Sequence, residues 1–183
     1  RSSDLLTAMF MAVWKGRAES DGLNALLLNA GIGWRDVAML RAVSRYLRQV
    51  GTPYAQDFIA DALNAHPQIA AALVAYFLAR FDPDLPDAGR AEAERAAAER
   101  IGTLLDDVAS LSDDTIVRAF RNFVAATVRT NYFRVDADGR PVETFAFKIA
   151  SAEVANLPRP APFREIWVYS PRVEGIHLRF GHV

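Results

Sequence analysis

The chain has 183 residues, of which 51% are hydrophobic and 23% charged, and its formal net charge is −1. Such a composition excludes intrinsic disorder, and the length fits one domain or one domain with part of a second. A net charge this close to zero argues against nucleic acid or an anionic membrane as a partner, and we expect neither. The absence of cysteine excludes disulfides and thiolate metal sites, and we expect a cytoplasmic protein.

The first two thirds of the chain are predicted to be helical. Apolar residues recur at helical spacing in residues 4–17, and Asp21-Gly22 opens a short helix that stops near Gly31 and Gly33. The clearest helix covers residues 34–50, because one side of it is consistently apolar and the other carries arginines. Further helices are expected from Thr52-Pro53 to the break at His66-Pro67, at 68–81, at 88–108 and from Ser112 onward.

Residues 69–79 form the longest apolar run, and Arg80 follows it at once. A membrane span needs roughly 20 apolar residues, so this run is predicted to be a core helix. His66-Pro67 is expected to break the preceding helix and to start this one.

The period changes after Phe133. A turn is predicted at 138–141, and residues 142–149 alternate in part, with Phe145, Phe147 and Ile149 on one face. The last stretch, Glu165 to Val183, contains two strand-like runs around the turn Ser170-Pro171. Alternate positions in these runs are predicted to form a buried face, namely Ile166, Val168, Ile176, Leu178 and Phe180. Trp167 and Tyr169 are also large, so the first run is expected to be covered on both sides.

We therefore expect a mainly α fold, with a multi-helix domain at residues 1–134 and a small C-terminal, antiparallel β portion at residues 135–183. A sheet that begins this late, in a chain without an initiator Met, is interpreted as part of a longer protein. An exposed edge strand tends to recruit a partner. The strand from Ile176 to Phe180 is thus expected to pair with a neighbouring copy or to be disordered.

Two groups of residues resemble ligand sites, and for each a structural reading is favoured. Gly31-Ile32-Gly33 resembles half of a dinucleotide loop, but a helix precedes it and no third glycine follows, so a helix-to-helix turn is predicted. Asp57, Asp61 and His66 could bind a divalent metal, although acids four residues apart are common on exposed helices.

Arg41, Arg45 and Arg48 form a basic stripe that could hold a small regulatory anion, an acidic neighbour or only solvent. His177 and His182 are five residues apart on an extended segment, so they are not expected to share a metal. Asp106-Asp107 and Asp113-Asp114 lie at a helix end and a helix start, where the helix dipole explains the second pair.

The segment Arg129-Thr130-Asn131-Tyr132-Phe133 closes a long helix where the helical region meets the sheet, and we interpret it as a structural junction. No nucleophile, base and acid can be assembled from the spacings. The sequence therefore predicts no catalytic, cofactor-binding or metal-binding residue in this chain.

Several segments in order resemble the large bacterial NAD-dependent glutamate dehydrogenases. They are Asp21 to Gln49, His66-Pro67, Arg80 to Pro83, Phe120 to Phe133, Ala146 to Ile149, and most specifically Val168 to Arg179, which reads VYSPRVEGIHLR. The resemblance implies that residues 135–183 are the first strands of an α/β catalytic domain, and that the glutamate and cofactor sites of the family lie beyond them. It also implies that NAD binds the parent protein and not this part of it.

We therefore expect a non-catalytic part of a glutamate dehydrogenase that links upstream regulatory regions to the catalytic domain. Its partners would be the rest of the parent chain and, in the parent, further copies of the same protein. The alternative is a non-enzymatic helical module for interaction or effector sensing. A downstream reading frame with a nucleotide-binding unit would favour the enzyme, and a stop codon would favour the module.

Overall fold

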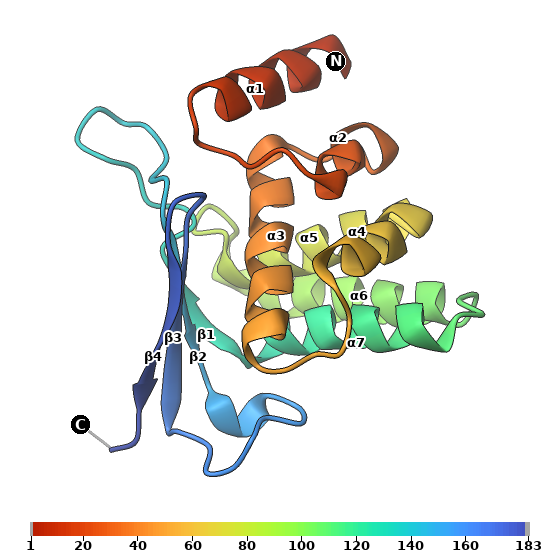
Figure 1. The fold of residues 1–183 in the computed structure, drawn as a ribbon, viewed down its shortest axis with the longest axis vertical. Coiled ribbons are helices and arrows are strands. Elements are labelled where there is room, and N and C mark those ends of the chain that lie inside the picture. The colour runs from red at the N-terminus through yellow and green to blue at the C-terminus, as the bar shows by residue number, and fades with distance from the viewer. Residues whose placement is uncertain (1, 182–183) are drawn as a thin grey trace.

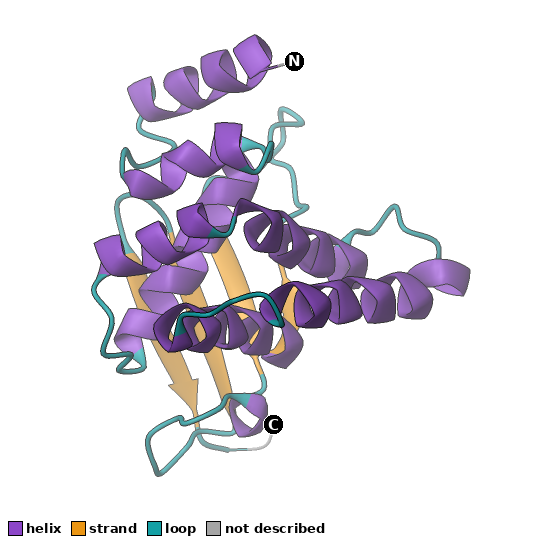
Figure 2. Ribbon diagram, turned by 90° about the vertical axis from the view of Figure 1, so that its right-hand side faces the viewer, coloured by secondary structure: helices purple, strands orange, loops and turns teal. Residues whose placement is uncertain are grey.

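The computed structural model describes residues 2–181, which form a layer of helices against one face of a four-stranded sheet (Figures 1 and 2). In Figure 1, helix α3 runs along the sheet, whereas α5, α6 and α7 extend away from it. The helices are α1 (Ser2–Trp14), α2 (Leu26–Asn29), α3 (Trp34–Gln49), α4 (Gln56–Ala65), α5 (Pro67–Phe81), α6 (Asp87–Leu105) and α7 (Leu111–Ala126), with the 3-10 turns η1 (Gly22–Ala25) and η2 (Ser151–Glu153). The mainly α prediction with a small antiparallel sheet is confirmed.

The strands follow one another in the sheet in chain order, and every neighbouring pair is antiparallel. The strands are β1 (Thr127–Thr130), β2 (Phe145–Ile149), β3 (Arg164–Tyr169) and β4 (Glu174–Arg179). Strand β1 continues directly from α7, so the sheet begins before residue 134.

The helices bury one face of the sheet. Phe145, Phe147 and Ile149 of β2 are at most 2% exposed, which confirms that they share a buried face. In β3 the buried residues include Trp167 and Tyr169, whereas Ile166 and Val168 are only half-buried on the other face. The prediction that Ile166 and Val168 belong to the buried face was wrong. Among the described residues, helices cover only one side of the sheet, and these two side chains lie on the other side.

The last strand is ordered within the chain. Strand β4 pairs with β3 along its whole length, after a turn in which the Ser170 amide donates to the Val173 carbonyl at 2.8 Å. The expectation of a disordered strand was therefore wrong for β4. Leu178 and Phe180 are 49% and 61% exposed, so this end of the predicted apolar face is open to solvent, and pairing of the outer edge with another copy stays a prediction.

Helices and sheet share one hydrophobic core. Phe123 of α7 contacts Tyr46 of α3 and Phe147 of β2 edge to face, with ring centroids 4.9 and 5.3 Å apart. Phe77 of α5 reaches the same Phe147 ring at 6.2 Å. Such aromatic contacts contribute beyond the area they bury. The core therefore crosses from the helical region into the sheet without a break.

Helices α4 and α5 meet at His66-Pro67, as predicted, with Pro67 as the first residue of α5. In residues 2–181 no single helix is both long and apolar enough to cross a membrane. Only α4 and α5 taken together reach that length and composition, and the two are bent by 99°.

The start of α7 differs from the prediction. The cap is Ser110, whose Oγ accepts a hydrogen bond from the Asp113 amide at 3.2 Å, and Ser112 lies inside the first turn. Both serines precede the acid pair, so the sequence did not distinguish them.

Replacing Ser110 with Ala is therefore expected to lower the free energy of unfolding by about 1 kcal/mol, because a free amide at the helix start loses its acceptor. Ser112→Ala is the matched control and is expected to be neutral or slightly stabilising, since alanine favours a helix interior. Urea denaturation of both variants measures the difference, and equal losses would contradict the observed cap.

Candidate functional site

The glycine pair of the sequence is a connector between helices. Gly31 has a φ of 66°, a conformation that L side chains rarely adopt, and it joins α2 to α3. The amide of Gly33 donates to the Asp36 carboxylate at 3.0 Å, which caps α3. The turn reading is confirmed.

The acids and histidine considered for a metal do not converge. Asp57 and Asp61 are exposed on α4, and His66 lies 2.9 Å from the Asp113 carboxylate, between its Nε2 and Oδ2 atoms. Within residues 2–181, no three His, Cys, Asp or Glu side chains gather as a metal site would require. His177 is exposed on β4. The prediction that His177 and His182 do not share a metal involves His182, which lies outside the described residues.

The arginine stripe of α3 does not face solvent as a single surface. Arg41 is fully buried and makes two bonds to the Asp21 carboxylate, at 2.6 and 2.7 Å, with a third to the side-chain oxygen of Asn24. Arg45 binds Glu19 at 2.7 Å, and Arg48 donates to the Tyr54 carbonyl. Acids of the chain itself thus bind Arg41 and Arg45, which supports the acidic-neighbour reading of the stripe, and the buried Arg41 is not open to a regulatory anion.

The positive charge of Arg41 stabilises the ionised carboxylate of Asp21. Burial alone would raise the pKa of Asp21, but the hydrogen bonds and positive charge of Arg41 hold it below its usual value. Asp21 also caps η1 by accepting from the Leu23 amide at 3.0 Å, which confirms the predicted helix start.

The N-terminal end of α3 is fastened to the segment that follows β1. Arg35 donates to the carbonyls of Tyr132 and Val142 at 2.7 and 2.8 Å. The Tyr132 hydroxyl donates to the Asp36 carboxylate at 2.8 Å, and burial raises the pKa of Asp36. The reading of 129–133 as a structural junction agrees with these contacts.

The middle of α3 is joined to β3 by buried polar bonds. The Tyr46 hydroxyl donates to the Glu165 carboxylate at 2.8 Å, and the Trp167 indole donates to the Ala42 carbonyl at 2.9 Å. The Tyr169 hydroxyl donates to Glu19 at 2.7 Å. We call the contacts of Arg35, Asp36, Ala42 and Tyr46 with Tyr132, Glu165 and Trp167 the α3–sheet junction.

Glu165 is the least expected member of this junction. It is 2% exposed, and no cation binds it among the described residues. Burial raises its pKa, and the hydrogen bond from Tyr46 offsets that only in part. The sequence reading missed it because a glutamate beside an apolar strand resembles an exposed strand end.

The polar groups of the α3–sheet junction are engaged in contacts within the chain. Its carboxylates accept from tyrosine hydroxyls and backbone amides, and burial raises the pKa values of Tyr46 and Tyr132, so these phenols stay neutral. All strand pairs in residues 2–181 are antiparallel, whereas a dinucleotide-binding βαβ unit has parallel strands.

Glu165→Gln tests the buried carboxylate. Because the folded protein binds the Glu165 proton more tightly than the unfolded chain does, its stability falls as pH rises from the ordinary pKa of 4.5 through the raised folded value. The variant lacks this loss. The difference in unfolding free energy between the variant and the unchanged 183-residue chain should therefore shift in favour of the variant between pH 4 and pH 8. Urea denaturation across that range measures it, with exposed Glu153→Gln as the control, and a pH-independent difference would contradict the assignment.

Tyr46→Phe removes the hydroxyl that donates to Glu165 and keeps the ring. The variant is expected to lose about 1–3 kcal/mol of unfolding free energy at neutral pH, because a buried carboxylate loses its donor. Combining it with Glu165→Gln should recover part of the loss. A double variant no more stable than Tyr46→Phe would show that the bond is unimportant.

Comparison with known proteins agrees with the resemblance seen in the sequence. Residues 18–83 match the family model described as glutamate dehydrogenase, helical motif 3. Residues 100–183 match the model described as bacterial NAD-glutamate dehydrogenase, catalytic domain. The junction between α3 and the sheet therefore joins parts of the chain that match different models.

Three curated relatives, all described as NAD-specific glutamate dehydrogenases, match nearly the whole chain. The protein of Halomonas elongata is 45% identical over 95% of the chain, that of Mycobacterium tuberculosis 44% over 94%, and that of Pseudomonas aeruginosa 41% over 99%. The chain spans about 11% of the length of each of these relatives. The chain belongs to the family of bacterial NAD-specific glutamate dehydrogenases and corresponds to the part in which helical motif 3 leads into the catalytic-domain region.

Proposed function

We propose that this chain is the scaffold that joins the helical region of an NAD-dependent glutamate dehydrogenase to its catalytic domain. The parent protein would convert L-glutamate, NAD⁺ and water to 2-oxoglutarate, ammonia and NADH. The chain itself would contribute no catalytic residue and no NAD site. Its partners would be the rest of the parent protein and, in the parent, further copies of it.

The observation that carries this proposal is the α3–sheet junction. Helix α3 belongs to the part that matches the helical motif, and β3 to the part that matches the catalytic domain. Buried hydrogen bonds from Tyr46 to Glu165 and from Trp167 to Ala42 link the two across about 120 residues of sequence. Buried polar groups are costly unless paired, so these bonds favour one relative placement of the two parts.

The chemistry of the proposed reaction also favours a scaffold role. Oxidation of an amino acid by NAD⁺ requires cationic groups for the substrate carboxylates, a group that manages protons and a nucleotide site. The carboxylates of Asp36 and Glu165 in the α3–sheet junction accept hydrogen bonds from tyrosines of the same chain. Its lysines are only Lys15 and Lys148.

Glutamate-dependent reduction of NAD⁺, followed at 340 nm, tests the proposal. The 183-residue chain is expected to show no turnover, and the protein of the complete reading frame is expected to be active. Trp167→Phe in the complete protein should lower its thermal inactivation temperature while leaving the pH profile of kcat unchanged, because the variant loses the bond to Ala42 and some core packing but no titrating group. Turnover by the isolated chain, or a changed pH profile in Trp167→Phe, would contradict a scaffold role.

A further inference from the structure

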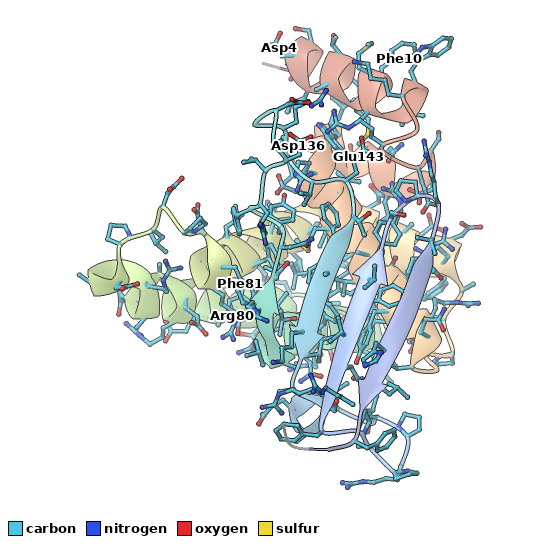
Figure 3. The ribbon with its side chains drawn as sticks, turned by 90° about the vertical axis from the view of Figure 1, so that its left-hand side faces the viewer. Asp4, Phe10, Arg80, Phe81, Asp136 and Glu143 are labelled. Atoms are coloured by element: carbon cyan, nitrogen blue, oxygen red, sulfur yellow. The ribbon has the colours of Figure 1, made fainter. Side chains whose placement is uncertain are left out.

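The open face of the sheet, opposite the helices, carries a row of basic side chains. Figure 3 looks onto this face, which no helix covers among the described residues. The register places Arg129 of β1 directly opposite Lys148 of β2, and the row continues through Ile166 of β3 to His177 of β4. Like charges directly opposite one another destabilise a sheet. The pairing of Arg129 with Lys148 therefore lowers the stability of the sheet, and no contact with the hydrophobic core accounts for it.

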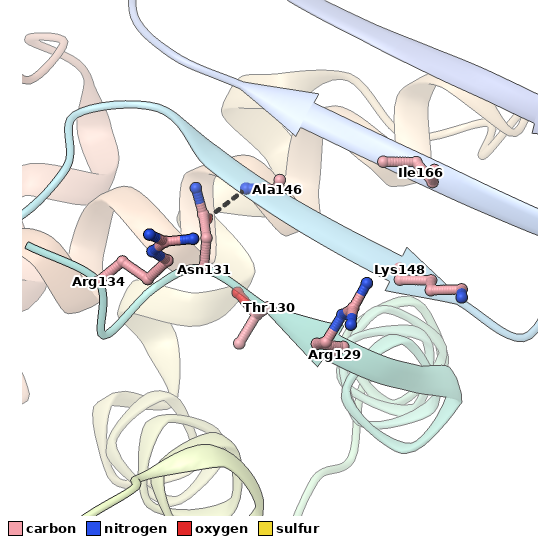
Figure 4. A pocket seen from close by; sticks show the side chains of 7 residues that line it. All are labelled: Arg129, Thr130, Asn131, Arg134, Ala146, Lys148 and Ile166. Atoms are coloured by element: carbon pink, nitrogen blue, oxygen red, sulfur yellow. Dashed lines mark hydrogen bonds between the residues drawn. The ribbon is translucent and has the colours of Figure 1, made fainter.

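The same side chains border a hollow of about 420 Å³ (Figure 4). Arg129 and Lys148 lie at one part of it, Arg134 lies beyond Asn131, and Ile166 belongs to the neighbouring strand. None of its lining residues is acidic. Small-molecule sites in proteins commonly have volumes of this order.

The three cations are not engaged elsewhere in the chain. Within residues 2–181, the side chains of Arg129, Arg134 and Lys148 make no ion pair or hydrogen bond with another residue. The arginines of α3, in contrast, are bound to the chain's own acids and carbonyls. The open face thus gathers positive charge in a chain whose formal net charge is −1.

The two neutral polar residues that line the hollow, Thr130 and Asn131, already form hydrogen bonds, and the Thr130 hydroxyl accepts from the Tyr132 amide at 3.1 Å. The Asn131 side chain accepts from the Ala146 amide at 2.7 Å and donates to the Thr144 carbonyl at 2.9 Å. These bonds hold the wall of the hollow in place and leave the cations as the principal binding groups. Recognition here would depend on charge, with Ile166 and Ala146 providing a small apolar surface.

We propose that this open-face hollow binds a small organic anion through carboxylate or phosphate groups. The guanidinium groups of Arg129 and Arg134 match either oxyanion with two parallel hydrogen bonds, and Lys148 adds a compact charge. A bound anion would also remove the repulsion between Arg129 and Lys148. The site is separate from the α3–sheet junction and does not depend on the proposed scaffold function.

Binding to the 183-residue chain tests the site directly, with succinate and inorganic phosphate as separate probes and sodium chloride at equal ionic strength as the control. At tenfold excess over Kd, a bound probe is expected to raise Tm by about 3 °C. A larger shift with succinate would identify a carboxylate ligand, and a larger shift with phosphate a phosphate ligand. No shift beyond that of chloride would overturn the proposal.

The variant Arg129→Gln/Lys148→Gln locates the site. It removes the opposed cations from exposed and half-buried positions, and it should bind the preferred probe at least tenfold more weakly in isothermal titration calorimetry. Arg134→Gln, a milder change, should weaken binding severalfold and covers the case in which the double variant folds poorly. Arg100→Gln, an exposed arginine on α6, is the matched control. Unchanged affinity in the open-face variants, or an equal loss in Arg100→Gln, would overturn the site.

Discussion

The arrangement of this chain depends on one constraint: polar groups that α3 and β3 bury against each other must find partners across the interface. The Tyr46 hydroxyl satisfies Glu165, and the Trp167 indole satisfies the Ala42 carbonyl, at distances of 2.8 and 2.9 Å. An unpaired group at either position would cost more than the pair contributes. The interface between α3 and β3 is therefore apolar, and its hydrogen bonds also fix how the helix is placed along the strand. Helix α7 and strand β2 pack beside this interface through Phe123 and Phe147.

Arginines of similar sequence context have different roles in this structure. Arg41 lies on the polar side of an amphipathic helix, yet it is fully buried because the segment before η1 brings Asp21 over it. Arg129 lies in β1, just after α7, and among the described residues it has no acidic partner on the open face. The difference arises from which acids the fold brings near each cation. The charge pattern of the sequence therefore does not tell which arginines the fold pairs with acids.

Most helix limits could be predicted, because proline, glycine and capping residues act locally. Gly51 has the positive φ expected of a helix end, and Pro67 starts α5. The cap of α7 was misplaced by two residues, since Ser110 and Ser112 are equally good candidates by type. Alternation in β2 correctly gave its buried face. In β3, both faces carry large side chains, and alternation alone could not decide between Trp167 and Ile166.

The sequence by itself determined the helical composition, the change to an antiparallel sheet near the end and the family, because these depend on local periodicity and on runs of specific residues. Only the tertiary structure decided which side of β3 is covered, that Arg41 and Glu165 are buried, and that Arg129 faces Lys148. Those outcomes depend on contacts between residues far apart in the chain. Burial and ion pairing at such positions are set by the packed neighbour, which the local pattern does not contain.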